Sequence, residues 1–232
     1  MIFIVAEIGV NWNGDYKIAE LMVKKAKEAG CNAVKFQAFN DKIIGDHPKR
    51  IELMKTAISK DNIEKINNIA KDNDIEWFCT PMYQDAVDLL ESYVSRYKIR
   101  MADSFNIINN QKSEILDRIL KTNKEIIISC EKSPVNCRYY KNDKIKWLYV
   151  VPKYPCELTD LNFKNIKDFD GYSNHCPNII APLTAAILGS KIIEVHVTLD
   201  KSKEYFDNNV SFSYDELTNL IQLVRLSEKI KK

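Results

Sequence analysis

Residues 16–39, YKIAELMVKKAKEAGCNAVKFQAF, combine a helical pattern with a short strand-like run. The first half has a helical period and ends at Gly30, a residue type that commonly terminates helices. In the second half, residues 33–37 form a short run in which Lys35 and Gln37 share one face, because alternate strand residues point to the same side. We interpret the stretch as one helix and strand of an α/β fold.

The same alternation continues along the chain in both directions. Strand-like runs are expected at residues 2–6, 33–37, 76–80, 97–101, 125–130, 147–151, 171–173 and 192–197. Helical patterns are expected at residues 16–30, 60–74, 83–93, 113–122, 181–190 and 213–232. Eight strands alternating with helices in a chain of 232 residues predict a closed TIM-type (β/α)8 barrel rather than an open doubly wound sheet. A glycine-rich phosphate loop follows none of these runs, which also disfavours a dinucleotide-binding fold.

Two local features refine this prediction. Residues 131–146, EKSPVNCRYYKNDKIK, contain a proline and lack an apolar period, so we expect a reduced fifth helical unit. Ser213 and Glu216 have the spacing of a capping box and predict the start of the last helix. We find no linker and expect a single barrel domain over residues 1–232.

Composition limits the classes of partner. The chain has 34 basic and 32 acidic residues, and this balance offers no broad field for nucleic acid or an acidic membrane. The N-terminus lacks a signal-peptide pattern, and no apolar run approaches membrane-spanning length. The six cysteines form no CxxC pair, as expected for reduced core thiols. We therefore expect a cytoplasmic protein that acts on small molecules.

Polar residues recur at the ends of the expected strands, where TIM barrels place their active sites. The group comprises Glu7, Lys35, Gln37, Thr80, Lys98, Arg100, Ser129, His175, Glu194 and His196. Single Thr or Ser residues at strand ends are commonly caps or turn residues. Charges inside a barrel are costly without a partner or ligand, so Lys35, Lys98 and Arg100 favour an anion site. The alternative for any one of these cations is a structural ion pair with Glu7 or Asp103.

Two of the three histidines fall at the same rim on neighbouring strands. His175 and His196, with Glu194 nearby, have the residue types that hold a divalent metal such as Mn²⁺ or Mg²⁺. The alternative is that at least one of them is a buried histidine with a structural hydrogen bond.

Taken together, these segments resemble the sialic acid synthase family, whose members condense phosphoenolpyruvate with N-acetylmannosamine or a related sugar. AEIGVNWNGD, AVKFQAF and CTP resemble the family's AEIGxNHNGD, AVKFQxF and STP. YKIRMAD, IIISC, GYSNH and GSKIIEVHVTLDK resemble KIxSGD, ILSTG, GYSDH and GAKVIEKHFTLDK, and a YP pair at residues 154–155 follows the sixth strand. The similarity covers nearly the whole chain.

The resemblance implies roles for individual residues. Glu7 would act in proton or water chemistry, Lys35 and Lys98 would hold phosphoenolpyruvate with hydroxyls such as Thr80 and Ser129, and His175 would bind the metal. Asn11 and Asn13 would offer uncharged donors and acceptors to a polyhydroxylated sugar. The expected catalytic residues are Glu7, Lys35 and Lys98. The expected substrate-binding residues are Asn11, Asn13, Gln37, Thr80, Arg100, Asp103, Ser129, Tyr154 and Ser173, and the expected metal ligands are His175 and His196.

The chain departs from the family pattern at several positions. Trp12 replaces a histidine, Met101 and Ala102 replace serine and glycine, and Tyr149 and Asn208 stand where the pattern has histidines. We also expect no C-terminal antifreeze-like domain. A dimer formed by swapping that domain would then be impossible, whereas a homodimer formed by the barrels would remain possible.

Three hypotheses follow from these departures. The first is a phosphoenolpyruvate-dependent condensing enzyme that forms a nonulosonic or other 3-deoxy-2-keto sugar acid from an amino sugar or related aldehyde. The second is an aldolase or lyase that uses Lys35 or Lys98 as a Schiff-base nucleophile. The third is a non-catalytic, anion-binding homologue.

Overall fold

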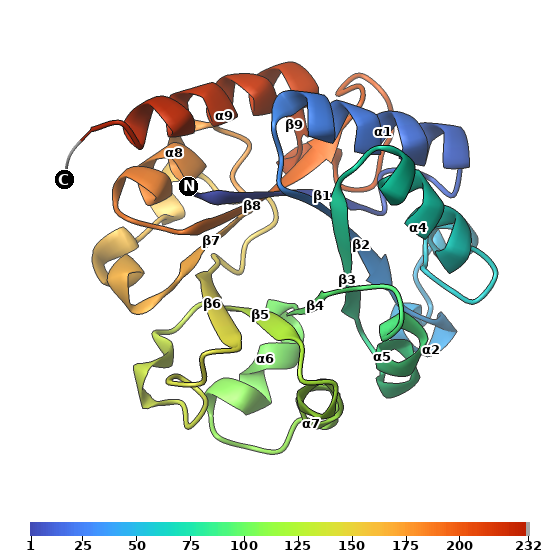
Figure 1. The fold of residues 1–232 in the computed structure, drawn as a ribbon, viewed down its shortest axis with the longest axis horizontal. Helices are drawn as coiled ribbons and strands as arrows, with labels where there is room; N and C mark the ends of the chain where they lie inside the picture. The colour runs from blue at the N-terminus through green and yellow to red at the C-terminus, as the bar shows by residue number, and fades with distance from the viewer. Residues whose placement is uncertain (231–232) are drawn as a thin grey trace.

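A computed structural model describes residues 1–230 of the chain. Within these residues, eight parallel strands are paired in sequence order and β8 pairs with β1, so that the sheet closes into a barrel (Figure 1). The strands are β1 (Phe3–Gly9), β2 (Ala33–Ala38), β3 (Glu76–Pro81), β4 (Arg96–Ile99), β5 (Glu125–Cys130), β6 (Ile145–Tyr149), β7 (Gly171–Asn174) and β8 (Ile192–Thr198). A two-residue strand, β9 (Phe212–Ser213), pairs with the end of β8. The predicted TIM-type barrel is confirmed.

Six helices match the helical patterns of the sequence and surround the barrel (Figure 1). They are α1 (Tyr16–Ala29), α4 (Ile63–Asp72), α5 (Gln84–Leu90), α7 (Glu114–Lys121), α8 (Ile180–Ile187) and α9 (Tyr214–Ser227). Gly30 ends α1 in the left-handed conformation, with φ of 96°, and the capping box of Ser213 and Glu216 opens α9, as expected. The last two residues of the final helical pattern, 231–232, lie outside the described residues.

Two crossover units contain only 3-10 turns among the described residues. The segment between β5 and β6 has a single such turn, η1 (Pro134–Asn136), which confirms the reduced fifth unit. The segment between β6 and β7 likewise has only η2 (Leu158–Asp160) and η3 (Phe163–Asp168), a reduction that the sequence had not indicated. Pro152 and Pro155 begin this segment and disfavour a helix there.

Three helices were not expected from the sequence. They are α2 (Asp41–Ile44), α3 (Arg50–Met54) and α6 (Met101–Ile108). The expectation that the fourth strand reaches Met101 was wrong, since β4 ends at Ile99 and α6 begins at Met101. Arg100, in an extended conformation, joins the two elements.

Strand register determines which side chains meet inside the barrel. Glu7 lies opposite Lys35 on one neighbouring strand and opposite His196 on the other. Ser173 lies opposite Glu194. Because parallel strands all point the same way, these residues gather at one end of the barrel, the carboxyl end.

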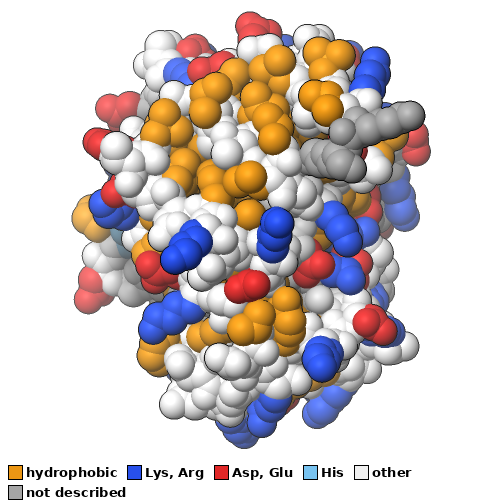
Figure 2. Space-filling view, turned by 90° about the vertical axis from the view of Figure 1, so that its left-hand side faces the viewer, with side chains coloured by type: hydrophobic (Ala, Val, Ile, Leu, Met, Phe, Trp, Pro, Cys, Tyr) orange, Lys and Arg blue, Asp and Glu red, His pale blue; other side chains and the backbone are white. Residues whose placement is uncertain are grey.

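The outer surface carries charges of both signs. Figure 2 shows lysine and arginine side chains intermingled with aspartate and glutamate on one face, beside exposed apolar side chains. Among residues 1–230, no helix combines the length and apolar character needed to cross a membrane.

Candidate functional site

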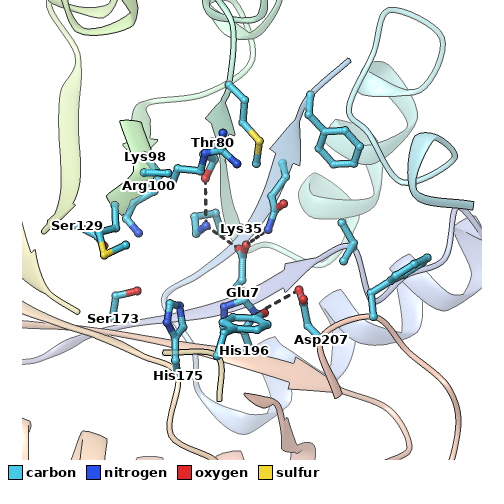
Figure 3. A pocket seen from close by; sticks show the side chains of 18 of the residues that line it. Glu7, Lys35, Thr80, Lys98, Arg100, Ser129, Ser173, His175, His196 and Asp207 are labelled. Carbon is cyan, nitrogen blue, oxygen red and sulfur yellow. Dashed lines mark hydrogen bonds and ion pairs between the residues drawn. The ribbon is translucent and has the colours of Figure 1, made fainter. Parts of the chain in front are cut away.

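A cavity of about 480 Å³ lies at the carboxyl ends of the strands (Figure 3). This volume is typical of small-molecule sites. Most residues expected from the sequence line it: Glu7, Lys35, Gln37, Thr80, Lys98, Arg100, Ser129, Tyr154, Ser173, His175 and His196. The barrel thus brings together side chains from all eight of its parallel strands or from the segments that follow them.

Four charged side chains form a buried network at the base of the cavity. Lys35 Nζ lies 2.9 Å from Glu7 Oε2 and 3.9 Å from Glu194 Oε2. Lys98 Nζ lies 2.9 Å from Glu194 Oε1. Lys35 also donates a hydrogen bond to Thr80 Oγ1 at 3.1 Å. The charges of the two lysines and two glutamates therefore balance, and this pairing compensates for the cost of burying them.

The network gives its members different proton affinities. Burial acts against the charge of both lysines. For Lys35, the attraction of Glu194 and Glu7 outweighs burial and raises the pKa. For Lys98, burial prevails and lowers the pKa. Burial would raise the pKa of Glu194, but Lys35 and Lys98 lower it to about 2. For Glu7, burial prevails and raises the pKa. Glu194 is therefore the permanent counter-ion, and Glu7 is the carboxyl better suited to exchange a proton.

One side of the cavity is suited to an anion. Ser129 is buried, and its hydroxyl has no hydrogen-bond partner among the described residues. Lys98 and Arg100 line the same cavity, and so do Met101 and Ala102 in the first turn of α6. A helix N-terminus attracts negative charge, and this attraction adds to that of the two cations.

Asp103 does not line this cavity. Its Oδ2 accepts a hydrogen bond of 2.6 Å from Arg100 Nε. The structure thus places Asp103 against the Arg100 guanidinium, and its contact with substrate stays a prediction.

The two histidines form a pair on the other side of the cavity. Their ring centroids are 5.5 Å apart. His175 Nδ1 lies 3.3 Å from the Val151 carbonyl oxygen, and His196 Nδ1 lies 3.4 Å from Asp207 Oδ2. Burial, with a further contribution from His196, lowers the pKa of His175 to about 4, so this imidazole is neutral at pH 7.

This pair fits a divalent metal as a source of two ligands. In metal sites one ring nitrogen of a histidine commonly faces a carboxylate or carbonyl while the other binds the ion. Both Nδ1 atoms here face such oxygens, which leaves both Nε2 atoms available. Among residues 1–230, no three His, Cys, Asp or Glu side chains are arranged around a common metal position. Any further ligands would come from water or substrate.

Tyr149, which replaces a family histidine, is not among the residues that line the cavity. Its ring packs against Phe163, Phe169 and Tyr172, with centroid distances of 5.9, 5.5 and 6.0 Å. The next residue, Val150, lines the cavity instead.

Asp207 is a site residue that sequence reasoning missed. It lies in the loop between β8 and α9 and lines the cavity. Burial opposes its charge, but hydrogen bonds from His196 and Tyr154 lower the pKa of Asp207. The only sequence signal was its position beside Asn208, which stands where the family pattern has a histidine.

The structure places Asn11 and Asn13 outside the cavity lining, contrary to expectation. Asn11 is fully buried, and its amide binds Val197, Ser211 and Asp207. Asn13 is exposed and lies beside Lys49 and Lys55 in a separate depression. Asn11 is thus a structural residue that joins the β1 loop to the β8–α9 loop.

Part of the cavity lining is apolar. This apolar wall consists of Val10, Phe39, Ile43, Ile44, Leu53, Met82 and Phe206. Val10, Phe39, Leu53 and Met82 belong to a hydrophobic cluster separate from the main core of the barrel, and the other three residues pack against that cluster. Sequence reasoning did not assign any of them to the site.

Comparisons with known proteins agree with this architecture. The model of the NeuB family matches residues 22–232. The N,N'-diacetyllegionaminic acid synthase of Legionella pneumophila is 30% identical, over 98% of this chain and 72% of the relative. The human N-acetylneuraminate-9-phosphate synthase is 28% identical, over 98% of this chain and 70% of the relative. The N-acetylneuraminic acid synthetase of Leptospira borgpetersenii, solved in complex with citrate, superposes with a TM-score of 0.86 at 26% identity, covering 98% of this chain and 84% of that one.

Proposed function

Because the chain belongs to the NeuB family, we propose that it is a phosphoenolpyruvate-dependent condensing enzyme. The product would be a nonulosonic or other 3-deoxy-2-keto sugar acid, made from an N-acyl amino sugar or related aldehyde with release of phosphate. The Legionella and human relatives are named for syntheses of this kind. The observation that carries the proposal is the buried Ser129 hydroxyl, which lacks a partner in the described chain and lines the same cavity as Lys98 and Arg100.

In the proposed reaction, C3 of the enol phosphate forms a bond to the aldehyde carbon, whose oxygen gains a proton. Water then adds to the cationic C2 and loses one proton, which offsets the proton gained by the aldehyde oxygen. As the bond from C2 to the phosphate oxygen breaks, the new C2 hydroxyl gives its remaining proton to the leaving phosphate and becomes the 2-keto group. Lys35, Lys98 and Arg100 hold the phosphate and carboxylate charges. Glu7 orients the water and accepts its proton, a role that suits a carboxyl with a raised pKa.

His175 and His196 would hold a divalent ion such as Mn²⁺ or Mg²⁺. When bound, such an ion supplies a Lewis acid for the acceptor carbonyl. Asp207 holds the ring of His196 in place, and the Val151 carbonyl does the same for His175.

The test is phosphate release from phosphoenolpyruvate, measured with and without Mn²⁺ against a panel of N-acylated amino sugars and simple aldehydes. Acceptor-dependent release is expected from the native chain. Glu7→Gln should lose turnover while phosphoenolpyruvate still raises its melting temperature, because Gln keeps the shape but cannot accept a proton. A native chain that binds phosphoenolpyruvate but releases no phosphate with any acceptor would favour the non-catalytic alternative.

One observation favours the Schiff-base alternative. Burial lowers the pKa of Lys98, and a neutral amine is the nucleophile in that chemistry. Borohydride treatment with pyruvate, followed by mass measurement, tests it, with Lys98→Arg as the matched control. Because Lys98 Nζ is ion-paired with Glu194 at 2.9 Å, we expect no adduct. A trapped adduct that is lost in the control would replace the condensing mechanism.

A further inference from the structure

The apolar wall gives the cavity two chemically different ends. We propose that this wall binds a methyl group of the acceptor, belonging either to a deoxy carbon or to an N-acyl group, and disfavours a hydroxymethyl or phosphate at that position. This inference rests on the proposed function, because it names the acceptor of that reaction.

The wall is assembled from segments that are distant in sequence. Val10 follows β1, Phe39 follows β2 and Met82 follows β3, and all three are buried. Leu53 comes from α3, and Phe206 from the β8–α9 loop. Each of these side chains lines the cavity and belongs to, or packs against, the same hydrophobic cluster. The wall is therefore one continuous apolar surface.

The position of the wall relative to the anion side indicates which part of a substrate would contact the wall. Lys98 and Ser129 come from β4 and β5, whereas Phe206 directly precedes Asp207, which contacts His196. In Figure 3, Lys98 and Ser129 lie to the left of Glu7, His196 lies below it, and Asp207 lies below it and to the right. An enol phosphate held on the anion side and an aldehyde held near the histidines leave the rest of the acceptor to extend along the wall.

Several polar groups near the wall are engaged with other protein groups. Gln37 Nε2 donates a hydrogen bond of 2.7 Å to Glu7 Oε1. His47 Nδ1 accepts from the backbone N–H of Lys49, whose ammonium lies 3.7 Å from Glu204 and over the Phe206 ring. A hydroxyl or phosphate against the wall would exchange its hydration for contact with apolar side chains, which is unfavourable.

The expected preference is moderate. An apolar pocket rejects an added hydroxyl by on the order of 100-fold at most. We therefore expect kcat/KM to be about 10- to 100-fold higher for a methyl-bearing acceptor than for its hydroxymethyl counterpart.

The experiment compares acceptors that differ at one group. One series is an N-acetylated amino sugar with methyl, hydroxymethyl or phosphorylated hydroxymethyl at C6; a second replaces N-acetyl by N-formyl at constant C6. The two series distinguish a deoxy methyl from an acyl methyl as the group bound. Ligand-observed NMR measures acceptor binding without phosphoenolpyruvate, and phosphate release measures turnover.

Two variants of one wall residue serve as a matched pair. Met82→Gln places a polar group of similar size in the wall, and Met82→Leu keeps it apolar. Met82→Gln should reduce the methyl preference several-fold, and Met82→Leu should retain it. The KM for phosphoenolpyruvate, measured in parallel, reports on the anion side.

Each outcome has a distinct meaning. Equal or reversed preference in both series, an unchanged preference in Met82→Gln, or failure of every acceptor to bind would overturn the inference. Phosphate release that requires a hydroxymethyl or phosphorylated acceptor would overturn it while leaving the proposed function intact. Preferential binding of the methyl-bearing acceptor without phosphate release would support the wall and contradict the proposed function.

Discussion

At the scale of single residues, the site separates groups that stabilise the fold from groups left free for a ligand. Glu194 accepts hydrogen bonds from Lys98 and Ser173, so its carboxylate is already paired with groups of the protein. Ser129, in contrast, has a buried hydroxyl without a partner in the described chain. A buried polar group of that kind costs stability until a ligand satisfies it.

Ser129→Ala should therefore separate stability from binding. We expect an unchanged or slightly increased free energy of unfolding, because the variant removes an unsatisfied hydroxyl. Loss of a hydrogen bond to a charged phosphate or carboxylate oxygen should weaken phosphoenolpyruvate binding by roughly 10- to 100-fold. Urea unfolding and calorimetric titration measure the two quantities. Thr80→Val is the contrasting variant, since Thr80 already accepts from Lys35 and should lose stability as well.

Glu194→Gln should destabilise the fold in a pH-dependent way. Its carboxylate pairs with buried Lys98 and Lys35, and its loss should cost about 3 kcal/mol or more at pH 7. The folded pKa of about 2 lies below the ordinary 4.5, so the unfolded chain binds more protons between these values. The stability that the carboxylate contributes is fully present above pH 4.5 and is lost as the pH falls toward 2.

Urea unfolding of chelator-treated protein between pH 7 and pH 3 checks this prediction. The difference between the native chain and Glu194→Gln should stay constant down to about pH 5 and shrink below it. A difference that does not change with pH would contradict the assignment. Glu125→Gln, which removes a partly exposed ion pair with Arg96, should cost less than about 1 kcal/mol.

At the scale of elements, the β8–α9 loop carries Asp207 and is held from the opposite end of the chain. Asn11 Oδ1 accepts from the backbone N–H of Asp207 at 2.9 Å, and Asn11 Nδ2 donates to the Val197 carbonyl at 2.9 Å. Ser211 Oγ donates to the Asp207 carbonyl at 2.6 Å. The loop conformation that presents Asp207 thus depends on an amide in the loop after β1.

Asn11→Ala should release this loop. Loss of the hydrogen bonds to the Asp207 N–H and the Val197 carbonyl should cost about 1–3 kcal/mol of stability. Hydrogen exchange should accelerate over residues 199–213 with little change in β4 and β5, and turnover should fall through displacement of Asp207. Asn13→Gly is the control, because Asn13 is exposed with a φ of 53° that glycine adopts readily. Unaltered exchange in the loop would refute the role of Asn11.

At the scale of the whole molecule, the closed barrel buries all six cysteines as free thiols. Burial raises the pKa of each thiol, as for Cys31, whose pKa rises to about 12. The thiolate is the reactive form, so a closed barrel protects the thiols in two ways.

Thiol labelling should consequently report global unfolding. We expect negligible reaction with an aromatic disulfide reagent at pH 8 in native conditions and six reactive thiols in 6 M guanidinium. The urea dependence of labelling should coincide with that of tryptophan fluorescence if the barrel unfolds cooperatively. Four reactive thiols in denaturant without reductant would instead indicate a disulfide, for which neighbouring Cys156 and Cys176 are the candidates.

Much of the fold and the polar part of the site could be predicted from sequence. Strand alternation is a local property, so Lys35 with Gln37 and Glu194 with His196 could be assigned to shared faces before their neighbours were known. Placing those faces at one rim required only that parallel strands have their carboxyl ends at the same edge of the sheet.

The remaining features depended on contacts between distant segments. Asn11 looks like a loop amide for a sugar in the sequence, but its partners lie 186, 196 and 200 residues away and bury it. Val10, Phe39, Leu53 and Met82 are indistinguishable from core residues by composition, and α2 and α3 are too short to show a helical period.

The sequence by itself thus determined the barrel and the charged base of its cavity, because both follow from the period of the strands. The tertiary structure alone decided that Asp207 faces His196, that Asn11 faces the protein and that apolar side chains form a wall. Which side of a loop faces the cavity is set by packing between segments far apart in the chain, and no local pattern records it.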